Sequence, residues 1–229
     1  MNINKIKTLG IITARKGSKG IPNKNYKIIK GKKRLIDYTI IESIKSRYIS
    51  KIAVSTDDER IIRHIKKYKI DYVIKRKKKF SRDNSKSIDA VIDVIKNFKN
   101  KDIDLVVLLQ PTSPLRKSFH IDEAIKLLCK KYKKYDSLVS ITSLEEPHPY
   151  KLKKIENGYL KSFIKGSNSE IPRQNLKKIY KLNGAIYLIK KNVLMNKKTF
   201  FYKTLPFKMD EKYSLNIDTI FDLKALQNI

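Results

Sequence analysis

The sequence has one cysteine, three histidines and no tryptophan among its 229 residues. Because Cys129 is the only cysteine, an intrachain disulfide is excluded, and its place in an apolar helical pattern indicates a buried side chain. His64, His120 and His148 are too far apart in the sequence to show a metal-ligand spacing. The chain also lacks an apolar run of about 18 residues and a signal-peptide pattern. We therefore expect a cytoplasmic protein without a membrane partner.

Acidic residues are scarce: 22 Asp and Glu stand against 53 Lys and Arg, a formal net charge of +31. Such a balance is typical of proteins that bind nucleic acid, membrane surfaces or anionic substrates. However, the lysines are scattered along the whole chain together with many Asn, Ile and Tyr residues, and only nine of the cations are arginines. A compositional drift explains this profile as well as selection for a polyanion-binding surface does. Under drift the individual lysines carry little information, and the positions of the few arginines carry more.

Short β-branched runs alternate with amphipathic stretches over the first 145 residues. The patterns predict strands over 8–13, 51–55, 71–74, 104–110 and 137–142, and helices over 35–46, 59–68, 87–98 and 120–132. This alternation favours right-handed βαβ units, and therefore an α/β protein with a doubly wound, mostly parallel sheet. Such sheets bind ligands beyond the carboxyl ends of their strands, which makes the loops at 14–25, 55–58 and 110–117 the candidate site.

The alternation stops after residue 145. Residues 151–165 follow a proline-broken stretch, and their Asn157-Gly158 pair predicts the turn of a β-hairpin. A strand over 182–191 and a terminal helix that starts near residue 218 then return the chain to the sheet. We expect a single domain over 1–229, from which 145–180 protrudes.

The loop at 14–25 reads ARKGSKGIPNKN and follows the first predicted strand. It matches neither the P-loop pattern nor G-x-G-x-x-G. Gly17 and Gly20 would let the backbone turn tightly and approach a ligand, and successive amides could form an anion nest. Arg15 offers a fork to phosphate oxygens, while Lys19 and Lys24 offer point charges. The loop therefore indicates either a phosphate site or a solvated turn with background lysines.

This loop closely resembles the N-terminal signature of the acylneuraminate cytidylyltransferases, the CMP-sialic acid synthetases. Further blocks resemble that family in the family's order: VSTD (54–57), LLQPTSPLR (108–116), PRQ (172–174), NGAIY (183–187) and NIDTIFDL (216–223). The resemblance implies a Rossmann-like fold of the nucleotide-diphospho-sugar transferase type. It also implies a homodimer, and we expect the segment 145–180 to be the place of contact.

The resemblance implies a reaction in which the anomeric hydroxyl of a nine-carbon 2-keto sugar acid attacks the α-phosphorus of CTP. Pyrophosphate leaves, a CMP-sugar forms, and Mg²⁺ (or Mn²⁺) is required. The acid would be of the sialic, legionaminic or pseudaminic type. Two alternatives stay open. One is a cytidylyltransferase for the eight-carbon acid 3-deoxy-manno-octulosonate. The other is a basic nucleic-acid-binding protein, for which the sequence offers no recognisable reading motif, so we expect no nucleic-acid partner.

By position, the resemblance assigns a set of nucleotide-binding residues, with Lys24 as the residue that stabilises charge at the α-phosphate. The assigned residues are Arg15, Gly17, Ser18, Lys19, Lys24, Asn25, Arg76 and Ser87. Arg76 stands in the charge run KRKKKF, so a solvated position is its alternative. Ser87 could equally be the N-cap of its helix.

A second set of residues is assigned to the sugar acid: Gln110, Ser113, Arg116, Arg173, Lys181 and Asn183. Arg116 could pair with an internal carboxylate instead. Lys181 stands where the family often has arginine, so a cation is kept and the bidentate fork is lost.

The metal site departs from the family pattern D-x-D-T, because this chain has Asn216 where the first carboxylate is usual. Residues two apart in an extended segment face the same side, so Asn216 and Asp218 could still reach one ion. Mg²⁺ takes oxygen ligands and usually keeps waters and substrate phosphates. We expect Asp218, with Arg15 and Lys24, to belong to the catalytic set. The alternative role of Asp218 is to cap the last helix.

Overall fold

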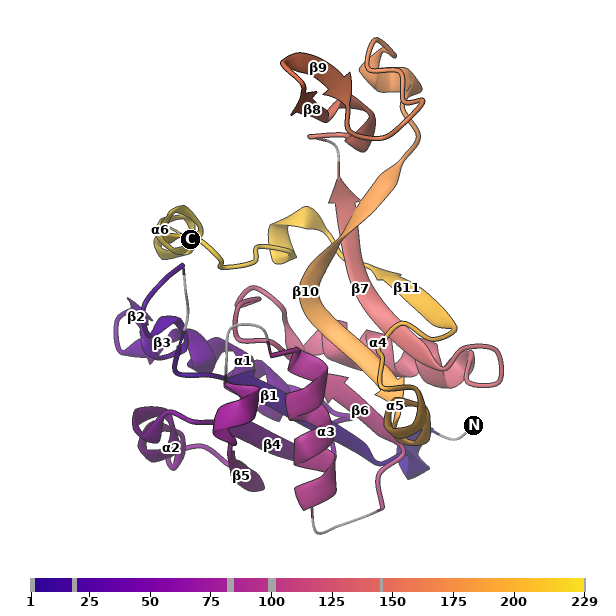
Figure 1. Cartoon of the computed structure of the whole chain (residues 1–229). Helices are drawn as coiled ribbons and strands as arrows, with labels where there is room; N and C mark the ends of the chain where they lie inside the picture. Colours follow the sequence, from indigo (N-terminus) through magenta and orange to yellow (C-terminus); the bar gives the residue numbers. More distant parts are fainter. Residues whose placement is uncertain (1–2, 18–19, 82–84, 99–101, 145, 229) are drawn as a thin grey trace.

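The computed structural model describes residues 3–17, 20–81, 85–98, 102–144 and 146–228. Within these ranges one seven-stranded sheet has the strand order β11-β7-β10-β6-β1-β4-β5 (Figure 1). Its strands are β1 Thr8–Ala14, β4 Lys51–Thr56, β5 Tyr72–Lys75, β6 Leu105–Leu108, β7 Ser137–Leu144, β10 Ile179–Lys190 and β11 Thr204–Lys208. Strand β10 is antiparallel to its neighbours β6 and β7, and the other pairs are parallel. The predicted mostly parallel sheet is confirmed.

Helices cover both faces of the sheet, because side chains along each central strand alternate between two hydrophobic cores. In β1, Ile12 joins the core beneath α1, α2 and α4, and Ile11 joins the core beneath α3 and α5 (Figure 1). The helices are α1 Leu35–Lys45, α2 Glu59–Ile65, α3 Ser87–Asn97, α4 Ser118–Lys130, α5 Lys191–Lys197 and α6 Ile220–Gln227. Cys129 is buried in the first core, as the sequence indicates. No helix in the described part of the chain is both long and apolar enough to cross a membrane.

A third, smaller core joins the segment 21–35 to the C-terminal segment 217–226. The small hairpin β2 Ile28–Lys30 and β3 Lys33–Arg34 packs beside α6. The buried apolar residues of this third core are Ile21, Ile29, Leu35, Ile217, Leu223 and Leu226. The Gln227 side-chain amide donates to the Ile29 carbonyl at 3.4 Å. The segment after the first loop and the segment before α6 are therefore held against each other.

The segment between β7 and β10 protrudes from the sheet (Figure 1). It carries the hairpin β8 Lys153–Glu156 and β9 Tyr159–Ser162. Asn157 and Gly158 both have positive φ, at 54° and 80°, as the type I′ turn of a two-residue hairpin requires. The predicted hairpin is confirmed, and the protrusion ends at the residue before Ile179, where β10 begins.

Helix α5 and strand β11 had no counterpart among the predicted elements, and neither had the small hairpin of β2 and β3. Helix α5 has seven residues, which is too short for a clear helical period. Strand β11 contains Pro206, which lowers its strand signal. The proline is tolerated because β11 is the edge strand of the sheet, where a missing amide donor costs little.

Candidate active site

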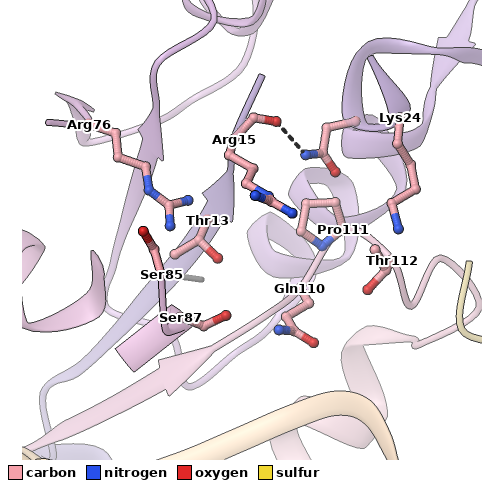
Figure 2. A pocket seen from close by; sticks show the side chains of 10 residues that line it. Thr13, Arg15, Lys24, Arg76, Ser85, Ser87, Gln110, Pro111 and Thr112 are labelled. Carbon is pink, nitrogen blue, oxygen red and sulfur yellow. Dashed lines mark hydrogen bonds between the residues drawn. The ribbon is translucent and has the colours of Figure 1, made fainter. Parts of the chain in front are cut away.

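A cavity of about 200 Å³ lies beyond the carboxyl ends of β1, β5 and β6 (Figure 2). Its position agrees with the general rule for ligands of parallel sheets. It is lined by Thr13, Arg15, Lys24, Asn25, Arg76, Ser85, Ser87, Gln110, Pro111 and Thr112. Five residues predicted for the nucleotide thus meet in one cavity, together with Gln110, which was predicted for the sugar. Ser18 and Lys19 lie outside the described residues.

Two guanidinium groups, of Arg15 and Arg76, point into this cavity (Figure 2). Arg76 is only 6% exposed, so the solvated alternative for this residue is wrong. Burial lowers the pKa of Arg76, the nearby Asp57 opposes that shift, and Arg15 adds to it. The buried Nε of Arg76 has no hydrogen-bond partner among the described residues. An anion in the cavity would supply that partner and offset the repulsion between the two cations.

The first loop is held at its start by two side chains. The amide nitrogen of Asn25 donates to the Arg15 carbonyl at 3.0 Å, which is the dashed line in Figure 2. The Asp57 carboxylate, at the end of β4, accepts from the backbone amide of Lys16 at 2.7 Å. Asn25 therefore closes the loop on itself while it lines the cavity. The VSTD block contributes through Asp57, which anchors the loop.

The two glycines of the loop have different surroundings. A Cβ on Gly20 would lie 2.5 Å from the backbone oxygen of Asp218, closer than Cβ atoms approach other atoms. A Cβ on Gly17 would find no described atom within 4 Å. Gly20 is therefore required by the contact with the segment before α6, and Gly17 leaves open space where a ligand can approach.

Lys24 connects the loop with that same segment. Its ammonium donates to the Ile217 carbonyl at 2.6 Å and to the Asp218 carboxylate at 3.2 Å. The Lys24 side chain is 12% exposed, and that of Asp218 is 64% exposed. These two predicted catalytic residues are thus neighbours, and Lys24 lines the cavity.

Asp218 does not cap the last helix, so that alternative is wrong. Thr219 is the N-cap, and its hydroxyl accepts from the backbone amide of Asp222. The Asp222 carboxylate in turn accepts from the backbone amides of Asp218 and Thr219, at 3.0 and 2.7 Å. This reciprocal arrangement is a capping box. It leaves the carboxylate of Asp218 facing Lys24 and Asn216.

Asn216 and Asp218 form the candidate metal site. The Asn216 amide nitrogen donates to the Asp218 carboxylate, and the Asn216 amide oxygen is buried without a partner in the described part of the chain. No cluster of three or more His, Cys, Asp or Glu side chains that could hold a metal ion occurs among the described residues. One carboxylate and one orphaned amide oxygen nevertheless fit Mg²⁺, which binds few protein oxygens and keeps waters and phosphates.

Replacing Asn216 by aspartate should lower the Mg²⁺ concentration that supports half-maximal activity by about thirtyfold. The added unit charge would attract a nearby cation by at least ~1 kcal/mol per cation charge, even in water. Titration of pyrophosphate release against Mg²⁺ checks this. Asn196→Asp, on the exposed side of α5, is the control for added charge. An unchanged midpoint in Asn216→Asp would place residue 216 outside the metal site.

A second cavity, of about 390 Å³, lies beside the segment before α6. It is lined by Thr142, Lys181, Leu182, Asn183, Glu211, Ser214, Leu215, Asn216 and Asp222. Gly184 marks the junction between the two cavities, because its absent Cβ would meet oxygens of Gln110, Asn216 and Ser113 at 3.2, 3.4 and 3.4 Å. Residues predicted for the sugar therefore gather next to the first cavity.

Two of these residues are committed to internal hydrogen bonds. Asn183 is 2% exposed, and its side chain bonds to the hydroxyls of Ser140 and Ser214 at 2.6 and 3.0 Å. Ser113 is fully buried and donates to the Asn183 carbonyl at 3.3 Å. Both residues shape the wall between β10 and the loop after β6.

Arg116 is 1% exposed, and its guanidinium is directed into the protein. It donates to the carbonyls of Gln110 and Ala185 at 3.2 and 2.9 Å, and to the Thr39 hydroxyl at 2.7 Å. These hydrogen-bond partners are carbonyls and a hydroxyl, and the internal Glu42 carboxylate acts on Arg116 only through its charge, which opposes the fall in the pKa. Burial lowers the pKa of Arg116 to about 9. Arg116 fixes the loop that carries Gln110 and, contrary to expectation, presents no surface to a sugar.

His120, next to Arg116, makes folding sensitive to mild acid. Burial, and secondly the Arg116 charge, lower the pKa of His120 to about 4. In the unfolded chain, His120 therefore takes up a proton near its ordinary pKa of about 6.5. In the folded protein, the His120 ring stays neutral at that pH. From pH 7 to pH 5 the free energy of unfolding should fall by about 2 kcal/mol because of this residue. Urea unfolding of wild type and His120→Asn at both pH values checks this. An equal fall in the free energy of unfolding between pH 7 and pH 5 in the two proteins would contradict it.

Arg173 is the predicted site residue that lies apart from the others. It is on the protrusion, where it lines a separate hollow with His148, and its Nε is 4.0 Å from the Glu146 carboxylate. It lines neither of the two cavities described above. Within one chain, the structure does not bring Arg173 to the other predicted residues.

Several lining residues were missed. Thr13, Ser85 and Thr112 line the first cavity, and Glu211 lines the second. Thr13 and Thr112 flank strand ends that were already marked as ligand-facing, so a signal existed for both. Ser85 and Glu211 stand in irregular stretches, for which periodicity gives no direction.

Comparisons with known proteins identify the family of the chain and proteins of the same fold. A family profile described as "Cytidylyltransferase" matches residues 9–226. The chain is 36% identical over 218 residues to an N-acylneuraminate cytidylyltransferase of Streptococcus agalactiae serotype V, covering 93% of this chain and 51% of that protein. It is 33% identical over 229 residues to the CMP-N,N'-diacetyllegionaminic acid synthase of Legionella pneumophila, covering 95% and 93%. The chain thus spans about half the length of the streptococcal relative.

Among solved structures, a CMP:2-keto-3-deoxy-manno-octonic acid synthetase complexed with CTP superposes with a TM-score of 0.71. The two share 17% sequence identity, and the match covers 97% of each chain. At this identity the likeness concerns the fold. The family profile matches most of the chain, and the chain resembles the legionaminic acid synthase over almost the full length of both proteins. The chain therefore belongs to the cytidylyltransferase family.

Proposed function

We propose that this protein activates a nine-carbon 2-keto sugar acid, of the sialic, legionaminic or pseudaminic type, with CTP. The products are the CMP-sugar and pyrophosphate. The cavity that gathers Arg15, Arg76 and Lys24 beyond the sheet carries this proposal, because it offers three cations to one anionic ligand. The named relatives activate N-acylneuraminate and diacetyllegionaminate with cytidylate, which supports the choice of substrates.

In this reaction the protein chiefly positions the reactants and stabilises negative charge. Arg15 and Arg76 would bind the phosphates, and the ammonium of Lys24 would stabilise charge that develops as pyrophosphate leaves. Asp218 and Asn216 would hold a divalent cation, Mg²⁺ or Mn²⁺, whose charge further neutralises the phosphates. Gly17, Ser18, Lys19 and Ser87 would also contact the nucleotide. No covalent nucleophile is required.

The sugar acid would lie at the second cavity, with its anomeric hydroxyl toward the first. Gln110 stands between the two cavities and can hydrogen-bond a hydroxyl group, and Lys181 offers a cation to the sugar carboxylate. Direct contacts from Ser113, Asn183 and Arg173 stay predictions. We place the reaction in the cytoplasm, where CTP is available, and treat 1–229 as one catalytic domain.

The decisive experiment measures pyrophosphate release from CTP and Mg²⁺ with a panel of sialic, legionaminic, pseudaminic and 3-deoxy-manno-octulosonic acids. We expect release with a nine-carbon acid and little with the eight-carbon acid. Preference for the eight-carbon acid would support the alternative cytidylyltransferase. No release with any acid, together with salt-sensitive DNA binding, would refute the proposal in favour of the nucleic-acid alternative.

We also propose a homodimer formed through the protrusion. Its hairpin exposes Ile155, Tyr159, Leu160 and Phe163 at 80, 72, 71 and 64%, and apolar clusters of this kind mark interaction sites. Light scattering should give twice the chain mass of 26.8 kDa. Leu160→Glu should shift the protein toward monomer, whereas Phe201→Glu, an exposed position outside the protrusion, should not. A monomeric wild type would contradict the proposal.

A further inference from the structure

Lys24 stands in a turn that has little support of its own. It opens the three-residue 3₁₀ helix Lys24–Tyr26, which follows Asn23 in the left-handed backbone region (φ 56°). The turn is closed by backbone bonds from Tyr26 to Asn23 at 2.9 Å and from Lys27 to Lys24 at 3.2 Å. Short 3₁₀ segments have poor hydrogen-bond geometry, so contacts from outside must fix such a turn.

Arg60, on α2, contacts the turn on both sides of Lys24. Its Nη2 donates to the Asn23 side-chain oxygen at 2.7 Å, and its guanidinium carbon lies 5.0 Å from the centre of the Tyr26 ring. The same guanidinium is held by a fork to Asp58, with Nε and Nη2 at 2.9 and 2.7 Å from its two oxygens. Because Asp58 is buried at the start of α2, Arg60 is itself fixed.

Arg34 contacts the same tyrosine from the small hairpin. Its guanidinium carbon lies 3.7 Å from the centre of the Tyr26 ring, and its Nη1 donates to the Tyr26 carbonyl at 2.7 Å. The Tyr26 ring is therefore in cation–π contact with two arginines. Neither arginine lines the cavity around Arg15, so the proposed chemistry does not by itself account for them.

We propose that Arg60 and Arg34 are positioning residues that fix the Lys24 turn and so direct the Lys24 ammonium to the cavity rim. This inference rests on the proposed function, because it assigns the two arginines a part in the same reaction. A planar guanidinium can stack on a ring and donate a fork at once, which a lysine ammonium cannot. In a chain with so many lysines, arginine at both positions agrees with a need for these two properties.

The test replaces Arg60 by lysine, which keeps the charge and removes the fork. Arg63→Lys is the matched control, because Arg63 is an exposed residue of the same helix. In Arg60→Lys, kcat should fall by about tenfold while KM for CTP changes less than about twofold, because the reacting geometry loosens and the phosphate contacts stay. Hydrogen exchange at the amides of Tyr26 and Lys27 should accelerate only in Arg60→Lys.

Two variants of Tyr26 distinguish a role of its ring from a role of its hydroxyl. Tyr26→Leu should reproduce the kcat loss of Arg60→Lys, and Tyr26→Phe, which keeps the ring, should recover most of the rate. If wild type is active and Arg60→Lys matches Arg63→Lys in kcat, the inference is wrong and the proposed function stands. The inference is also wrong if the kcat loss is explained entirely by a lowered melting temperature, because the loss would then report stability and not positioning. If wild type releases no pyrophosphate with any acid, the proposed function fails, and the inference fails with it.

Discussion

Replacement of Gly20 by alanine should reduce the rate of pyrophosphate release by about two orders of magnitude. The new methyl group would lie 2.5 Å from the Asp218 backbone oxygen, so either the first loop or the segment before α6 must move. Both carry catalytic candidates, Lys24 and Asp218, which are 3.2 Å apart. A displacement of about 1 Å between reacting groups can cost about a hundredfold in rate.

Gly17→Ala is the comparison for this variant, because its methyl group would meet no described atom. It adds the same methyl to the same loop where the proposed nucleotide approaches, so it should raise KM for CTP, while the rate at saturating CTP should fall much less than in Gly20→Ala. Initial rates at saturating CTP, with melting temperatures of both variants, check the expectation. Equal rates for the two alanine variants would show that the contact between Gly20 and Asp218 does not determine activity.

Replacement of Lys24 by alanine should lower kcat by about two to three orders of magnitude while the protein stays folded. This is the usual cost of removing one charged or polar group that stabilises developing negative charge. The Lys24 side chain is largely buried and fixed by Ile217 and Asp218, so its ammonium needs little rearrangement when the charge develops. Single-turnover rates with preformed CTP complex separate this effect from binding.

Lys27→Ala is the matched control for Lys24→Ala. Lys27 is exposed and only three residues away, so it reports the effect of losing one positive charge from the same loop region. Its rate should stay within about twofold of wild type, since distant exposed charges are screened by salt. An unchanged kcat in Lys24→Ala would remove this lysine from the catalytic set.

The sheet could be predicted from sequence because its strands are short apolar runs between amphipathic helices. The position of the first cavity followed from one rule, since residues just beyond the ends of β1 and β6 must meet at the same edge. Directions within the site could not be read in this way. Arg116 and Gln110 are both polar residues of one loop. Gln110 lines the first cavity, whereas the guanidinium of Arg116 points inward to the carbonyls of Gln110 and Ala185.

Contacts between distant segments were also beyond the sequence. The reason for Gly20 is a carbonyl almost 200 residues later, and nothing in the loop itself indicates that neighbour. The roles of Arg34 and Arg60 depend on Tyr26, which no local pattern connects with α2. By contrast, the scarcity of arginine was informative, because described arginines such as Arg34, Arg60 and Arg116 make specific contacts where lysine would not suffice.

The place of β10 in the sheet has a consequence for how the chain is synthesised. Strand β6 is fully buried between β1 and β10, but its contacts with β10 involve residues about 80 positions further on. At a synthesis rate of about 5–20 residues per second, one apolar edge of the nascent sheet stays unpaired for roughly 4–16 s. Unpaired edges promote association between chains. Basic residues are spread along the whole of this chain of net charge +31, so incomplete nascent copies are also positively charged and repel one another during that interval, a benefit that would not depend on where any single lysine stands.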